Sequence, residues 1–122
     1  MTRVIDVHQH AGPWPFPGRW GGIELNLELT EKRGIDAAVI SSTEAIVDDM
    51  IAGNARLAED LAGHPGGHPG LYGYVTLNPR YPELSAREME KYAGHPQFVG
   101  YKIHTSYSGT AMGEPRMAAL FE

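Results

Sequence analysis

The feature that most constrains the fold of this chain is a fourfold alternation of strand-like and helix-like segments. The strand-like runs are rich in β-branched and aromatic residues and occupy 3–8, 37–42, 71–77 and 98–104. Helix-like stretches follow them at 24–33, 46–62, 84–93 and 114–122. Parallel strands need such crossovers, because a tight turn cannot join two strands that run the same way. The sequence therefore predicts an α/β fold of about four parallel β-α units.

Residues near the expected helix ends define the boundaries further. Gly34 is expected to cap the first helix at its C-terminus. Gly53 marks a break within the second helix, and Ser85 is the candidate N-cap of the third. Pro115 suits the first turn of the last helix, because its missing N–H has no partner there in any case.

Composition narrows the class of protein. The chain has 122 residues, of which 42% are hydrophobic and 20% charged, and we expect one domain over residues 1–122. The net charge of −5 and the lack of a basic cluster predict that nucleic acid is not a partner. The lack of a long apolar run or a signal-peptide core predicts a cytoplasmic protein without a membrane span. With no cysteine, a metal would be held by histidine and carboxylate.

The stretch "VIDVHQH" at residues 4–10 carries two histidines one residue apart. Side chains alternate along a strand, so Asp6, His8 and His10 are expected on one face. Ile5 and Val7 would then lie on the opposite face, which suits a hydrophobic layer. Solvated histidines on an edge strand are the alternative for this stretch taken alone.

The fourth strand-like run repeats this arrangement. The same rule puts Lys102 and His104 on one face of residues 98–104, and Tyr101 and Ile103 on the other. Polar groups thus gather where the parallel strands end, and active sites of parallel α/β folds lie at that edge. The sequence predicts a functional site there, built from His8, His10, Lys102 and His104.

Four segments in this order resemble the amidohydrolase superfamily. They are "DVHQH" (6–10), "RGIDAAVISS" (33–42), "VTLNP" (75–79) and "VGYKIHTSYSG" (99–109). The similarity is to its metal-dependent hydrolases and decarboxylases of the aminocarboxymuconate-semialdehyde decarboxylase type, and it covers essentially the whole chain. It implies a (β/α) barrel, and a metal-dependent hydrolase or decarboxylase that acts on a small carboxylate, amide or lactone substrate.

The resemblance also implies roles for individual residues. His8 and His10 would be two ligands of a divalent metal, usually zinc, which activates a water molecule. Lys102 and His104 would line the pocket as catalytic residues. Lys102 would bind a carboxylate or phosphate, or alternatively be carboxylated and bridge metals. Asp6 would hydrogen-bond a ligand histidine, or serve a structural role near the barrel floor.

Two Gly- and Pro-rich loops accompany these motifs. Residues 9–22 form a stiff, aromatic loop that is expected to do more than connect two elements. "GHPGGHPG" at 63–70 is expected to be a turn-rich connector after a helix. Its two histidines are the next candidate metal donors.

The resemblance extends to half of the expected barrel only. Barrels of this type have eight strands and about 250 residues, and further ligands follow on strands five, six and eight. Here about four strands precede the last helix. We therefore expect a partial (β/α) TIM barrel that is completed by oligomerisation, most simply as a homodimer. Two functions stay open, namely a metal-dependent enzyme and a catalytically incomplete half-barrel that self-associates and binds metal weakly or not at all.

Overall fold

A computed structural model describes residues 2–122, and it contains one sheet of four parallel strands in the order β1-β2-β3-β4. The strands are β1 (Ile5–Ala11), β2 (Ala37–Ser42), β3 (Gly70–Thr76) and β4 (Phe98–Lys102). The helices are α1 (Ile23–Lys32), α2 (Thr43–Val47), α3 (Met50–Ala62), α4 (Pro82–Tyr92), α5 (Thr105–Ser108) and α6 (Pro115–Ala118). The predicted α/β class with a partial (β/α) barrel is confirmed.

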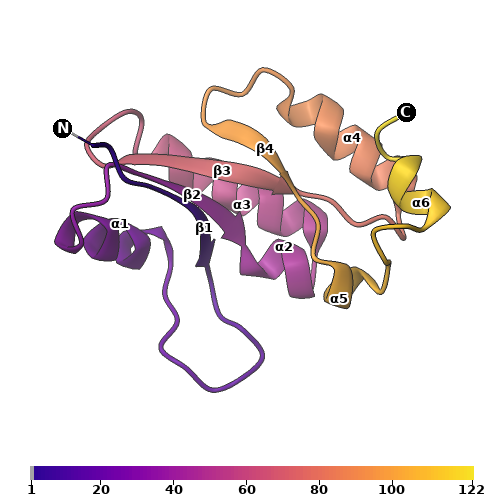
Figure 1. Cartoon of the computed structure of the whole chain (residues 1–122), viewed down its shortest axis with the longest axis horizontal. Coiled ribbons are helices and arrows are strands. Elements are labelled where there is room, and N and C mark those ends of the chain that lie inside the picture. The colour runs from indigo at the N-terminus through magenta and orange to yellow at the C-terminus, as the bar shows by residue number, and fades with distance from the viewer. Residues whose placement is uncertain (1) are drawn as a thin grey trace.

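Helices α1, α3 and α4 pack on one face of the sheet, and Figure 1 looks onto the other face, with α3 behind the strands. We call these the covered face and the open face. Two aliphatic clusters lie between the covered face and the helices. Their buried members are Ala11, Ile23, Ala38, Ile40, Leu57, Leu61 and Leu71 in one cluster, and Val75, Leu77, Tyr92 and Leu120 in the other. Within residues 2–122 no helix is long and apolar enough to cross a membrane.

The second predicted helix divides into α2 and α3, but the break is not at Gly53. The break lies at Asp48 and Asp49, and the Asp49 carboxylate accepts hydrogen bonds from the first amides of α3. Gly53 lies inside α3, where a Cβ would collide with the backbone of Ala45 in α2. Glycine here permits close helix packing, and propensity alone cannot distinguish that role from a break.

The other predicted helix ends have mixed outcomes. Gly34 follows α1 with a φ of +63°, as a C-terminal capping glycine requires. Pro115 opens α6 as predicted. The prediction of Ser85 as an N-cap is wrong, because α4 begins at Pro82. Ser85 is buried inside the helix, and its hydroxyl bonds to both the N–H and the C=O of Asn78.

Strand β1 contains an irregularity that changes which way its side chains point. Asp6 pairs with Ala38 and Gln9 pairs with Ile40, so β1 has one residue more than β2 in this interval. Ala38 and Ile40 both belong to the covered face. The predicted common face for Asp6 and the histidines is therefore wrong, because the bulge puts Asp6 on the covered face.

The prediction that Ile5 and Val7 pack against a hydrophobic layer is also wrong. Ile5 pairs with Ala37, one residue out of phase with the covered-face residue Ala38. Both Ile5 and Val7 are exposed, and no helix covers them. The bulge thus changes the face on which side chains of β1 lie, while β1 still runs parallel to β2 and pairs with it.

Candidate functional site

The open face brings together the four polar residues that the sequence singled out. His8 Nε2 lies 3.1 Å from Lys102 Nζ, and the rings of His8 and His10 are 5.1 Å apart. His8 and Lys102 come from the two edge strands, so their side chains meet over β2 and β3. Ser41 in β2 and Thr76 in β3 are buried although no helix covers this face. The catalytic and ligand roles of the four residues stay predictions.

Two aromatic side chains complete the site, and the sequence motifs did not identify them. Trp14 packs with its ring 5.0 Å from His10 and 6.1 Å from His104. Tyr107, from α5, lies 4.9 Å from His104 and 5.9 Å from Trp14. The indole ring of Trp14 therefore lies between His10, near the end of β1, and His104, which follows β4. The aromatic composition of the loop was the available signal, but it did not indicate which ring contacts the histidines.

The loop that carries Trp14 is held closed by its own contacts. The N–H of Gly12 donates to the carbonyl of Gly21 at 2.8 Å, and this bond joins the two ends of the loop. Trp20 Nε1 donates to the carbonyl of Phe16 at 2.9 Å, and the Phe16 ring stacks on Trp14. These bonds give the segment a defined conformation over the site, as its composition suggested.

Burial and positive charge keep the imidazoles of His10 and His104 neutral. Desolvation, followed by the charges of Lys102, His8 and His104, lowers the pKa of His10 from the ordinary 6.5 to about 4. Desolvation and then the Lys102 charge lower the pKa of His104. Burial also lowers the pKa of Lys102. His10 and His104 are therefore uncharged at neutral pH, and each offers a lone pair to a ligand.

Several buried polar atoms of the site have no hydrogen-bond partner among residues 2–122. They are His10 Nε2, His104 Nδ1 and Thr76 Oγ1. An unpaired buried nitrogen is costly, and a metal or a bound molecule would satisfy it. The described part of the chain contains no cluster of three His, Cys, Asp or Glu residues suited to a metal ion. The described residues would therefore offer a metal at most a partial ligand set, and the roles of His8 and His10 as donors stay a prediction.

Asp6 does not contact an imidazole, although the sequence allowed that role. Its carboxylate accepts a hydrogen bond from the backbone N–H of His8 at 3.0 Å and another from Gln9 Nε2 at 3.0 Å. Asp6 thus acts on the main chain of the histidine segment from the covered side.

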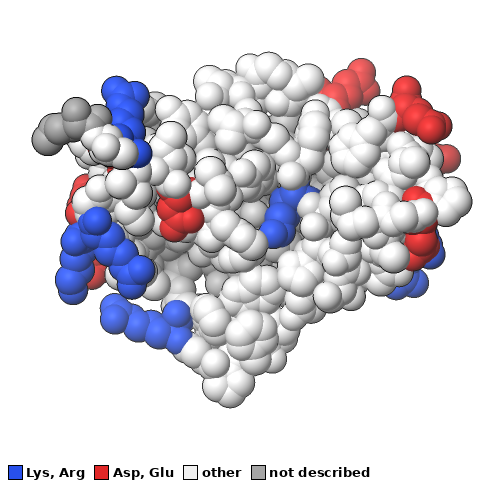
Figure 2. All heavy atoms as spheres, in the orientation of Figure 1, with Lys and Arg blue, Asp and Glu red and all other residues white. Residues whose placement is uncertain are grey.

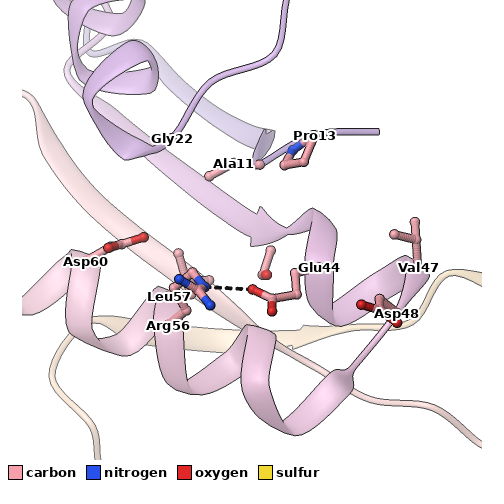
Figure 3. A pocket seen from close by; sticks show the side chains of 11 residues that line it. Ala11, Pro13, Gly22, Glu44, Val47, Asp48, Arg56, Leu57 and Asp60 are labelled. Atoms are coloured by element: carbon pink, nitrogen blue, oxygen red, sulfur yellow. Dashed lines mark hydrogen bonds and ion pairs between the residues drawn. The ribbon is translucent and has the colours of Figure 1, made fainter. Parts of the chain in front are cut away.

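A separate pocket of about 450 Å³ opens near the carboxyl ends of β1 and β2 (Figure 3). Arg56 donates to Glu44 at 2.7 Å across it, and Asp60 stands at its side. Burial raises the pKa of Asp60, and the Glu24 charge adds to this effect. The pocket includes none of the four site residues. Figure 2 shows the open face, where charged groups gather at the two ends and the middle is mostly uncharged apart from a basic group.

Four parallel β-α units with histidines at the strand ends define part of a (β/α)-barrel protein with a site in the usual place. Residues 5–122 match the amidohydrolase family, and the chain belongs to this family.

Among solved structures, the chain is similar to 5-carboxyvanillate decarboxylase from Novosphingobium aromaticivorans, with 24% sequence identity and a TM-score of 0.57. That protein was solved with manganese and 4-hydroxy-3-methoxy-5-nitrobenzoic acid. The alignment covers 80% of this chain and 30% of the decarboxylase, so the likeness concerns the fold. A comparison with curated proteins gave no match.

Proposed function

We propose that this chain provides the first half of the active site of a metal-dependent hydrolase or decarboxylase that acts on a small carboxylate-bearing molecule. The observation that carries the proposal is the pair of neutral, buried, unpartnered imidazole nitrogens on His10 and His104 beside Lys102. Unpartnered imidazoles at the strand ends suit ligand binding better than a purely structural role.

A divalent metal, zinc or manganese, fits this donor set in part. Imidazole is a good ligand for zinc, whereas manganese prefers oxygen ligands, and His8 and His10 supply two imidazoles from one strand. The manganese in the similar decarboxylase supports a divalent metal in this fold. When bound, the ion would supply Lewis-acid activation of water or of a carboxylate. Further ligands would have to come from outside the described residues.

Lys102 and the aromatic residues would then bind the organic substrate. The Lys102 ammonium is half-buried, and it is well placed to hold a carboxylate next to the histidines. Trp14 and Tyr107 offer flat apolar surfaces around His104, against which a planar substrate could stack. His104, uncharged at neutral pH, could accept a proton or a hydrogen bond from the substrate.

A catalytically incomplete half-barrel that self-associates is the second candidate. Two observations favour it, namely the lack of a three-ligand cluster within residues 2–122 and the unpaired outer edges of β1 and β4. Turnover of model esters in the presence of zinc distinguishes the two candidates. The enzyme would hydrolyse such an ester and lose this activity with a chelator, whereas the incomplete fragment would not hydrolyse it.

Calorimetry with zinc tests the proposal on the purified chain. We expect weak binding, because two neutral ligands fall short of a normal zinc site. The His8→Ala/His10→Ala variant should lose at least tenfold in affinity. A matched control, His64→Ala/His68→Ala, removes two histidines from the 63–70 connector and should bind zinc as the wild type does. Tight binding that survives the first double substitution would place the metal elsewhere and contradict the proposal.

A second arm addresses the substrate. The probe is 4-hydroxy-3-methoxy-5-nitrobenzoic acid, the molecule bound in the similar decarboxylase. Lys102→Gln removes the charge while keeping a polar side chain, and it should weaken binding of the probe about tenfold or more. Equal binding to wild type and Lys102→Gln would remove Lys102 from the substrate site.

A further inference from the structure

We propose that a partly buried polar bracket on the covered side of β1, formed by Asp6, Gln9, Asn26 and Thr30, positions the backbone of His8 and His10 for metal binding. These are positioning residues, and none contacts the metal donors' rings. The proposal rests on the metal-binding role proposed above for the two histidines. It adds Gln9, Asn26 and Thr30, to which the resemblance implied no role, and it assigns Asp6 to the main chain of His8 instead of an imidazole.

The bracket contacts the main chain of the histidine segment, residues 8–10, at both ends. At one end, the Asp6 carboxylate accepts the backbone N–H of His8 at 3.0 Å. At the other end, Asn26 Nδ2 donates to the backbone carbonyl of His10 at 3.1 Å. The main chain between these two contacts runs from His8 to His10, and it includes part of the bulge, which lies between Asp6 and Gln9.

Gln9 joins the two ends into one network. Its Oε1 accepts from Asn26 Nδ2 at 2.9 Å, and its Nε2 donates to Asp6 at 3.0 Å and to Thr30 Oγ1 at 3.2 Å. Each NH₂ group has two hydrogens, and both amides use both of them. The orientation of every member is therefore determined by the others, as a positioning device requires.

The burial of Asn26 and Thr30 indicates that the network does more than cover the sheet. Asn26 is 9% exposed and Thr30 is fully buried, and they lie one helical turn apart on the stripe of α1 that faces β1. Leucine or valine would serve packing at these two positions without any polar group to satisfy. Instead α1 presents an amide and a hydroxyl to Gln9, a polar side chain in a strand position that faces a helix.

The bulge is the structural consequence of this bracket. Without it, strand alternation would put Asp6 on the open face with the histidines, as the sequence pattern predicted. The carboxylate instead turns to the covered face, where Gln9 holds it, and caps the His8 amide. The geometry of the two histidines thus depends on contacts made behind the strand.

The main test is Asn26→Leu, which removes both of the bonds donated by Asn26 while keeping a similar size. We expect the dissociation constant of zinc, measured by calorimetry, to rise tenfold to a hundredfold, as is usual when an outer partner of a metal ligand is lost. The matched control is Asn54→Leu. Asn54 is also a buried helix asparagine, and it bonds the backbone of Thr76 in β3 instead of β1. Zinc affinity in this control should change less than threefold.

Two further variants keep the test decisive. Thr30→Val removes one acceptor without changing shape, so it should fold even if Asn26→Leu does not, and it should raise the dissociation constant two- to fivefold. Gln9→Leu combined with Asn26→Leu replaces the polar pair with apolar groups, which should recover part of the lost stability. Zinc affinity should stay low in this double variant, because the hydrogen bond to the backbone carbonyl of His10 is not restored.

A readout without metal separates this inference from the proposed function. The amide hydrogen-exchange rate of His8 is compared with that of Leu61, which reports on the core. Asn26→Leu should raise the His8-to-Leu61 ratio at least tenfold, and Asn54→Leu should leave it unchanged. Should the wild type bind no zinc, the proposed function fails and this ratio alone decides the inference. An unchanged ratio, or equal loss of zinc affinity in the Asn26 and Asn54 variants, would overturn it.

Discussion

The two faces of the sheet are built on different principles. The covered face is aliphatic, and side chains such as Leu61 and Ile40 are completely buried against helices. The open face has no helix, and its carboxyl end is closed by polar and aromatic side chains that meet across the strands, including His8, Lys102 and Trp14. At its amino end, Ile5 and Val7 are exposed. The aliphatic core is therefore concentrated on one face, and the candidate site lies on the other.

The pairing of β3 with β4 is also irregular, between Gly73 and Tyr74, but the difference between the two faces bears directly on β1. It has to present two histidines on the open face and still join the core through Ala11 on the covered face. The bulge and the polar bracket behind it reconcile these demands. Strand β2, which carries none of the four site residues, pairs with β3 without an irregularity from Ala37 to Ile40.

The largest expected effect concerns stability. Leu61→Ala on the covered face should lower the free energy of unfolding by about 2–5 kcal/mol, because it leaves a cavity at a fully buried position. Val7→Ala, at a side chain that is 58% exposed, should lower it by less than about 0.5 kcal/mol. Urea unfolding of both variants measures the contrast. Similar losses would mean that Val7 is buried in solution, and the two faces would then differ less than described.

The next expected effect concerns self-association, which we predict for this chain. Exposed Ile5, Val7 and Val99 accompany two unpaired strand edges, and a second copy could cover both. Sedimentation equilibrium over a hundredfold concentration range should detect a dimer, the simplest assembly. Val7→Lys should raise its dissociation constant at least tenfold, since it places a charge in the apolar contact.

Met112→Lys is the matched control for self-association. Met112 is 74% exposed but lies outside the sheet, between α5 and α6, so the substitution should leave association unchanged. A monomer at every concentration would contradict the predicted dimer. The contrast between the faces would then rest on the unfolding data alone.

Much of the fold was predictable because it depends on local patterns. The β-branched run at 37–42 became β2 with the predicted bounds, and Gly34 terminates α1 as its position suggested. The bulge in β1 was not predictable, because it depends on contacts between residues far apart in the chain. Asn26 reaches the carbonyl of His10 over 16 positions, and no periodicity in either segment records that contact.

The candidate site divides in the same way. Parity along residues 98–104 indicated that Lys102 and His104 share a face. Strand β4 ends at Lys102, and its pairing with β3 is irregular between Gly73 and Tyr74, so the register does not extend to His104. The position of Trp14 over His10 follows from a loop closed by the Gly12–Gly21 hydrogen bond. Loop conformation of this kind depends on individual long-range bonds, so the sequence indicated a functional loop without indicating its contacts.

The smallest expected effect is a pH dependence that originates on the open face of the metal-free chain. Burial and the Lys102 charge hold the pKa of His10 at about 4, below its ordinary 6.5. As pH falls from 6.5 to 4, the unfolded chain therefore takes up this proton first, and folding stability decreases. A pKa shift of this size would change the free energy of unfolding by about 3 kcal/mol if fully realised. Screening by solvent at the half-buried ring reduces this contribution to about 1 kcal/mol. Unfolding in urea with a chelator, compared between wild type and His10→Gln at pH 7 and pH 4.5, measures this difference.

Lys102→Gln removes one cause of the pKa shift of His10 and should show an intermediate pH dependence of stability. If His10→Gln loses as much stability in acid as the wild type, the pH dependence originates in other groups, and the open face contributes nothing to it.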